Sequence, residues 1–109
     1  MHLQLERTSP GEIVCYLQGT VDRQTVPAIR RKLLRSARET GVSQMVVDLA
    51  KVSALDTAAV AMLVELLRVL AEKRGKLRLV GLNEQTTKMI RLSRLDALFH
   101  LDPHATSGS

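Results

Sequence analysis

The feature that most constrains the fold is the stretch between residues 44 and 74, where a short apolar run precedes a long apolar segment of different period. Within residues 45–49 the apolar residues lie on both faces of a strand, which is typical of a strand in a covered sheet; they are Met45, Val46, Val47 and Leu49. From Val60 onward, residues placed about 100° apart around a helix axis fall into a broad apolar face and a narrow charged edge. This pattern predicts a helix packed on that sheet. The predicted core face consists of Val60, Leu63, Val64, Leu67, Leu70 and Ala71, and the charged edge of Glu65, Arg68 and Glu72.

The junction between this strand and this helix carries Asp56 and Thr57 after a six-residue loop. Both residue types accept hydrogen bonds from the free backbone N–H groups at a helix start. We therefore expect a hydroxyl at the positive end of the helix. A second apolar stripe either packs against a neighbouring helix or, at Met62 and Leu66, provides an exposed contact for a partner; it consists of Ala59, Met62, Leu66 and Val69.

Length and composition indicate one domain with an aliphatic core. The chain has 109 residues, 45% of them apolar, but one Phe, one Tyr and no Trp. We expect residues 1–102 to form the domain and residues 103–109 a flexible tail. No apolar run reaches the ~20 residues of a membrane helix and no export signal is recognisable, so we expect a cytoplasmic protein without membrane insertion. A single cysteine, Cys15, excludes an internal disulfide and a thiolate metal cluster.

The charged and titratable residues indicate little chemistry. The net charge of +5 arises from 16 basic and 11 acidic residues and favours an anionic partner only weakly. We interpret the basic face of the expected first helix as a solvated exterior in preference to an anion site; it carries Arg30, Arg31, Lys32, Arg35 and Arg38. Few aromatic residues and no recognition-helix pattern argue against direct nucleic-acid binding. His100 and His104 lack a third ligand and no catalytic set is recognisable, so we expect no metal, no cofactor and no enzyme.

Strand and helix patterns alternate along the chain after an initial hairpin. Alternating apolar residues around Pro10-Gly11 predict the hairpin, and helical spacing predicts a first helix over residues 26–39. After the central strand and helix, a strand at residues 76–80 and a third helix at residues 84–92, which Asn83 can cap, precede a short final strand. The order β-β-α-β-α-β-α-β implies an α/β domain whose mixed, mostly parallel sheet is packed with helices.

Several short motifs together resemble the STAS domain family, which includes sulfate-transporter domains and anti-sigma factor antagonists. Each motif is short, and their order and spacing carry the resemblance, which covers about residues 3–102. The motifs are Gly19-Thr20-Val21-Asp22, Val47-Asp48-Leu49, Asp56-Thr57-Ala58-Ala59-Val60-Ala61 with Leu63, Leu79-Val80-Gly81-Leu82 and Leu95-Asp96-Ala97-Leu98-Phe99. The resemblance implies a protein-binding regulatory module that controls transcription by partner switching.

The position of Thr57 matches the residue that a partner kinase phosphorylates in the bacterial antagonists. The resemblance therefore implies phosphorylation at Thr57 and an anti-sigma factor or serine/threonine switch kinase as partner. Asp22 either caps the first helix or, as in the family, contacts that partner from the loop beside the acceptor. With the exposed stripe included, the expected partner-binding residues are Asp22, Asp56, Thr57, Ala58, Ala59, Met62 and Leu66.

The helix head departs from the antagonist pattern, which is Asp-Ser-Ser-Gly or Asp-Ser-Thr-Gly. Here Asp56-Thr57-Ala58-Ala59 keeps the acceptor hydroxyl but lacks the second hydroxyl and the glycine. This pattern also resembles the small STAS subunits of phospholipid-transport ABC systems, in which the Thr resembles a contact for the ATPase subunit and phosphorylation is not implied. The sequence leaves both branches open.

Overall fold

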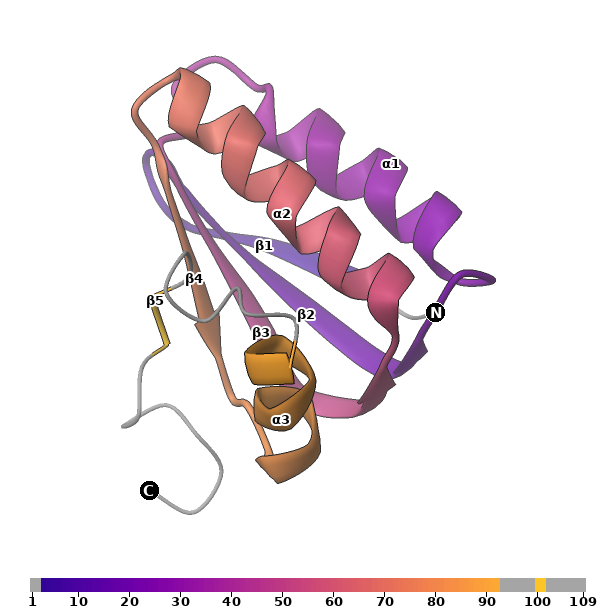
Figure 1. Ribbon diagram of the computed structural model, residues 1–109. Coiled ribbons are helices and arrows are strands. Elements are labelled where there is room, and N and C mark those ends of the chain that lie inside the picture. The colour runs from indigo at the N-terminus through magenta and orange to yellow at the C-terminus, as the bar shows by residue number, and fades with distance from the viewer. Residues whose placement is uncertain (1–2, 93–99, 102–109) are drawn as a thin grey trace.

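The computed structural model describes residues 3–92 and 100–101 and shows the expected order of strands and helices. Figure 1 shows the two long helices lying side by side across one face of a sheet. The predicted order β-β-α-β-α-β-α-β is confirmed. The elements are β1 (Leu3–Ser9), β2 (Glu12–Val21), α1 (Val26–Ala37), β3 (Gln44–Leu55), α2 (Thr57–Glu72), β4 (Lys76–Val80), α3 (Glu84–Leu92) and β5 (His100–Leu101).

The sheet has the strand order β1-β2-β3-β4-β5, in which β5 is only two residues long. The first two strands form the predicted antiparallel hairpin, and its turn uses Gly11 at φ +89°, where a residue with a side chain is strained. The remaining neighbours pair in parallel, as the alternation of strands and helices predicts. The mixed, mostly parallel sheet is thereby confirmed.

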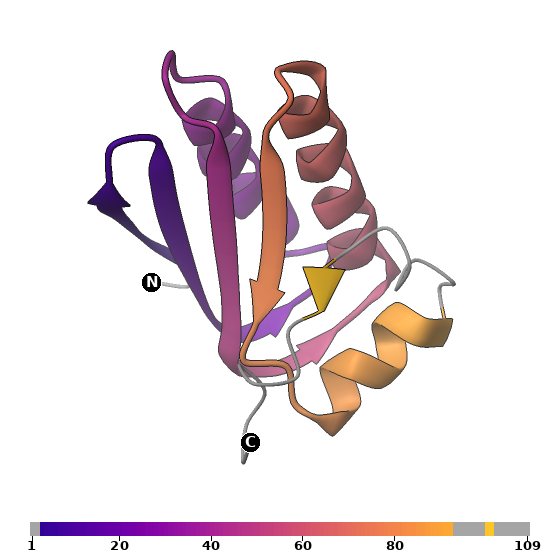
Figure 2. The same cartoon turned by 90° about the vertical axis from the view of Figure 1, so that its left-hand side faces the viewer.

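The core lies between one face of the sheet and the helices α1 and α2. Alternate residues of the paired strands are buried and share that face, as the register of Cys15 with Val47 and of Val47 with Leu79 shows. Figure 2 looks at the sheet from the face opposite α1 and α2, which lie behind the strands, and shows α3 at the end where α2 begins. The cap predicted for α3 is confirmed, because Asn83 Oδ1 accepts the Thr86 backbone N–H at 2.8 Å.

The central strand is longer than the sequence suggests. The expected six-residue loop after residue 49 is instead part of β3, which continues to Leu55. This extension stays paired with β2, so that Gly19 lies opposite Val52 and Val21 opposite Leu55, across irregular registers. The expectation of a loop is wrong because β2 is itself long, continues to Val21 and offers pairing as far as Leu55. The two strands therefore end side by side.

The buried face of α2 is rotated relative to the predicted one. Val60, Leu63 and Leu70 are buried as predicted, but Val64 and Leu67 are only half-buried and Ala71 is exposed. The second stripe contributes most of the remaining buried face, with Ala59, Met62 and Leu66 each at most 3% exposed. The helix α2 packs against α1 as well as against the sheet. The contact with α1 buries residues of α2 that contact with the sheet alone would leave exposed.

Candidate functional site

The candidate site is the point where the parallel strands β2 and β3 end next to each other. Val21 and Leu55 are register partners, so the residues that follow them, Asp22 and Asp56, leave the sheet together. The Asp56 backbone N–H donates to the Val21 carbonyl at 3.3 Å and extends the pairing by one step. The strand register thus brings together two acidic residues that lie 34 positions apart in the sequence.

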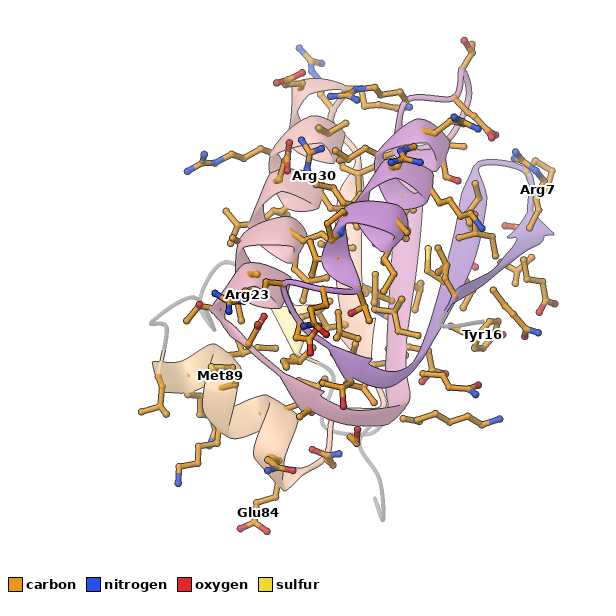
Figure 3. The ribbon with its side chains drawn as sticks, turned by 90° about the vertical axis from the view of Figure 1, so that its right-hand side faces the viewer. Arg7, Tyr16, Arg23, Arg30, Glu84 and Met89 are labelled. Atoms are coloured by element: carbon orange, nitrogen blue, oxygen red, sulfur yellow. The ribbon has the colours of Figure 1, made fainter. Side chains whose placement is uncertain are left out.

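Asp56 joins the start of α2 to the segment that follows β2. Its backbone is extended (φ −111°, ψ −175°), and its Oδ1 accepts the Ala59 N–H at 2.9 Å, which makes it the N-cap residue. Its Oδ2 accepts the Arg23 backbone N–H at 3.0 Å, and Figure 3 shows Arg23 close to the first turn of α2. The predicted capping role of Asp56 is confirmed, and both carboxylate oxygens are engaged by the backbone.

Asp22 holds the turn that leads into α1. Its Oδ1 accepts the backbone N–H groups of Gln24 at 2.9 Å and Thr25 at 3.1 Å. The Asp22 backbone N–H donates in return to Thr25 Oγ1 at 3.0 Å, as in a reciprocal helix-capping arrangement. Of the two roles considered for Asp22, the helix start is the one for which the structure shows contacts. Sequence reasoning missed Thr25, the N-cap position of α1, because Asp-x-x-Thr lacks the Glu or Gln of the usual capping signal.

Thr57 is the first residue of α2, and its side chain is exposed. Within residues 3–92, its hydroxyl has no hydrogen-bond partner. Ala58 beside it is half-buried. A second hydroxyl pair lies nearby on the strands, where Thr20 Oγ1 and Ser53 Oγ are 3.3 Å apart. The free hydroxyl of the junction is therefore that of Thr57.

Three of the expected partner-binding residues do not reach the surface. Ala59 and Leu66 are 0% exposed and Met62 is 3% exposed. The expectation that Met62 and Leu66 form an exposed stripe is wrong, because this side of α2 faces the core. The accessible part of the candidate site consists of Asp22, Asp56, Thr57 and Ala58.

Other kinds of site find no support among the described residues. No group of three or more His, Cys, Asp or Glu side chains in that part of the chain is placed to hold a metal ion. Cys15 is fully buried, and desolvation raises the pKa of its thiol to about 12, so that the thiolate is not formed near neutral pH. Within the same residues, no helix has both the length and the apolar character needed to cross a membrane.

Comparison with known families and structures fits this geometry. The family model of the STAS domain matches residues 4–107, which is nearly the whole chain. The chain belongs to the STAS domain family. An anti-sigma factor antagonist from Mycobacterium paratuberculosis superimposes on this STAS domain with a TM-score of 0.82 at 25% identity, covering 93% of this chain and 84% of that one.

Two further solved structures share the STAS fold at lower identity. The anti-sigma factor antagonist SpoIIAA in its unphosphorylated form has a TM-score of 0.75 at 20% identity, covering 92% of this chain and 86% of that chain. The Bacillus cell fate determinant SpoIIAA in its phosphorylated form has a TM-score of 0.74 at 22% identity, covering 92% and 90%. The arrangement of β3 and α2 in this STAS domain thus belongs to a fold that solved antagonists share.

The missing glycine of the helix head does not disturb this STAS domain. Ala59 occupies the glycine position, lies inside α2 and does not have a positive φ. Its methyl group is buried, and its N–H donates to Asp56. The backbone therefore places no demand for glycine at this position, and the methyl group does not add to the exposed surface.

Proposed function

We propose that this STAS domain is an anti-sigma factor antagonist whose binding to an anti-sigma factor is switched by phosphorylation of Thr57. The observation that carries the proposal is the exposed Thr57 hydroxyl at the first position of α2, which is free of partners within residues 3–92 while the carboxylate beside it is fully engaged. The structural likeness to the Mycobacterium antagonist and to SpoIIAA, solved in unphosphorylated and phosphorylated forms, supports this role.

The surroundings of Thr57 suit a modification that changes binding and leaves the fold intact. A phosphate adds about −1.5 to −2 charges at neutral pH. The unpaired N–H groups and the dipole at the start of α2 stabilise negative charge there, so the domain tolerates it. Asp22 and Asp56 already place two carboxylates at this surface, and a further negative group repels an acidic or closely packed partner. Release of the partner follows from charge at the interface.

The direct test is the intact mass of the protein after incubation with ATP and a candidate switch kinase. We expect one added phosphate on the wild type and none on Thr57→Ala, because Ala58 offers no second acceptor and Ser53 is paired with Thr20 on the strands. Phosphate that persists in Thr57→Ala would show that another residue is the acceptor and would refute this site assignment.

A charge-mimic variant tests the interface without the kinase. Thr57→Glu should weaken binding to the anti-sigma factor more than about tenfold in calorimetry, with an unchanged circular dichroism spectrum. Ala71→Glu is the matched control, because it adds the same charge at an exposed position of α2, about 21 Å along the helix axis from Thr57. Equal affinity of Thr57→Glu and wild type would remove Thr57 from the interface.

The two alanines after Thr57 favour a second candidate function, that of a regulatory subunit for the ATPase of a phospholipid-transport ABC system. In that role Thr57 is a contact residue, and no phosphate is added. Thr57→Ala should then weaken the complex by about 0.5 to 1.5 kcal/mol through a lost hydrogen bond, and binding should change the ATPase rate. The mass measurement and an ATPase assay with the purified partner separate the two functions.

A further inference from the structure

The excess positive charge of this chain is concentrated on one helix. The segment from Arg30 to Arg38 holds five basic residues and no acidic one, and the other 11 basic residues of the chain are matched by its 11 acidic residues. The net charge of +5 therefore equals the charge of this segment.

Three of these residues form a stripe along the exposed side of α1. Arg31, Arg35 and Arg38 follow one another at i, i+4 and i+7, which aligns them over about 10 Å of helix. All three are exposed and have no ion pair within residues 3–92. Together with Leu34, Arg30 and the acidic Glu39, they border a shallow hollow of about 490 Å³. We call Arg31, Arg35 and Arg38 the arginine stripe.

Arg30 differs from the arginine stripe because it already has a carboxylate. Figure 3 shows Arg30 between α1 and α2, where its Nε donates to Glu65 Oε1 at 2.6 Å and its Nη2 to the other carboxylate oxygen. The hydrogen bond and charge of Arg30 lower the pKa of Glu65, and the charge of Arg38 adds a smaller lowering. This fork shows which geometry the arginine side chains of α1 adopt with a carboxylate.

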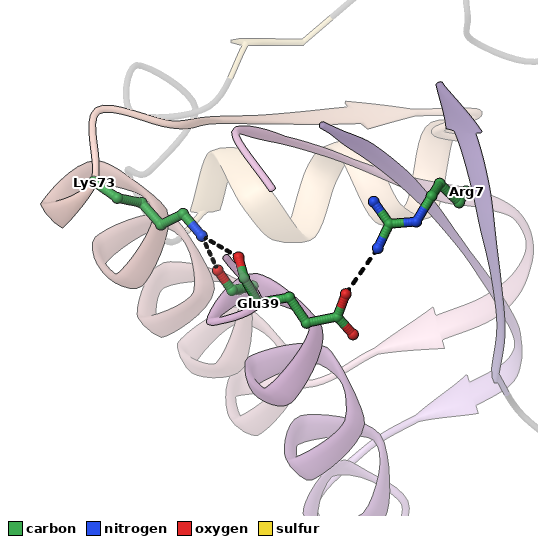
Figure 4. A network of polar contacts seen from close by, with 4 residues as sticks. Arg7, Glu39 and Lys73 are labelled. Atoms are coloured by element: carbon green, nitrogen blue, oxygen red, sulfur yellow. Dashed lines mark hydrogen bonds and ion pairs between the residues drawn. The ribbon is translucent and has the colours of Figure 1, made fainter. Parts of the chain in front are cut away.

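The needs of the helix end explain only part of the arginine stripe, because Arg35 in the last turn and Arg38 at the C-cap lie at the negative end of the helix dipole, whereas Arg31 lies well before it. Lys73 Nζ donates to the carbonyl oxygens of Ala37 at 2.7 Å and Glu39 at 2.8 Å (Figure 4). The first of these carbonyls is that of the last residue of α1. The Glu39 carboxylate is taken by Arg7 at 2.8 Å. Like charges at i, i+4 repel and weaken a helix. The three charges of the stripe therefore exceed what the end of α1 and the charge of Glu65 balance.

We propose that the arginine stripe docks an acidic segment of a partner protein, whose carboxylates take the position that Glu65 occupies on Arg30. A single-stranded nucleic acid needs stacking platforms, and the chain has only one Tyr and one Phe, neither of them on α1. A membrane surface favours an apolar flank, and apart from the basic residues, Lys32 included, the exposed residues of α1 are only Pro27 and Ala28. The contact is separate from the head of α2, because the stripe occupies the later turns of α1.

The test measures fluorescence anisotropy of a labelled ten-residue poly-glutamate peptide at about 50 mM salt, where exposed charges are weakly screened. The triple variant Arg31→Glu, Arg35→Glu, Arg38→Glu should lose affinity more than about tenfold. The matched control changes the net charge equally at exposed positions outside α1, through Lys51→Glu, Lys76→Glu and Lys88→Glu, and should lose less than about threefold. Equal losses in both variants would overturn the proposal, since net charge alone would then explain binding.

Two further measurements distinguish the possible ligands and show whether a loss of binding is due to misfolding. A DNA duplex and vesicles with phosphatidylserine, tested at the same salt, should bind more weakly than the peptide; tighter binding of either one would overturn the assignment to an acidic protein segment. The triple variant Arg31→Gln, Arg35→Gln, Arg38→Gln removes the charges without adding repulsion. It should also lose affinity for the peptide while its circular dichroism spectrum stays unchanged. Retained peptide binding in this folded variant would refute a role for the guanidinium groups.

Discussion

Leu66→Ala should destabilise the domain strongly, because the observed face of α2 buries this side chain completely. Leu66 is 0% exposed, whereas its neighbour Leu67 is half-buried. Truncating Leu66 removes about three carbon groups at about 0.8 kcal/mol each and leaves a cavity, so we expect a loss of about 3 to 4 kcal/mol. Leu67→Ala removes the same atoms from a side chain that water already reaches, and we expect about 1 kcal/mol.

Urea denaturation followed by circular dichroism measures the loss of unfolding free energy in both variants. The slope of this free energy against urea concentration should stay unchanged. The difference of about 2 to 3 kcal/mol corresponds to a melting temperature roughly 10 °C lower for Leu66→Ala than for Leu67→Ala. The pair is matched because the two substitutions are chemically identical, adjacent in sequence and at equally helical positions. A larger loss for Leu67→Ala would restore the core face that the sequence predicts and would refute the rotated one.

The other structural features make independent predictions. Asp56→Ala should cost about 2 kcal/mol in urea denaturation, because it removes the N-cap bond and the bond from Arg23. Cys15, with its pKa raised to about 12, should react with iodoacetamide more than about 100-fold slower in the native state than in the unfolded state. Gly81→Ala should cost at least about 2 kcal/mol, because its Cβ would lie 2.7 Å from Asp48 Oδ1, whereas Gly41→Ala, also at positive φ but with nothing within 4 Å, should cost about 1 kcal/mol.

Sequence patterns predict the elements well where period and capping agree. The hairpin at Pro10-Gly11, the alternation of strands and helices and the Asn83 cap each follow from local signals that the tertiary structure reinforces. The position of Asp56 at the head of α2 follows in the same way. The expected tail at residues 103–109 lies outside the described residues. Local chemistry thus identifies the junction that forms the candidate site.

The orientation of α2 and the length of β3 depend on neighbours that the sequence does not name. Nearly every position of α2 between its charged residues is apolar, so its apolar residues alone allow several core faces. Its charged edge is more informative, since the direction opposite Glu65, Arg68 and Glu72 lies about 20° from the centre of the buried face. The centre of the predicted face lies about 75° from the centre of the buried face. The extension of β3 likewise follows from the length of β2, a pairing that periodicity along one strand cannot reveal.

The two proposals make opposite electrostatic demands on one partner, and together they predict how the switch responds to salt. Asp22 and Asp56 are held by backbone N–H groups, so Thr57 is the group at this junction whose charge can change without breaking a contact of the fold. An acidic partner is attracted by the arginine stripe on α1 and repelled by a phosphate at the head of α2. Both effects act between exposed charges and weaken beyond a Debye length of about 8 Å at physiological salt. The difference in partner affinity between wild type and Thr57→Glu should therefore shrink as salt rises, together with the effect of removing the arginine stripe.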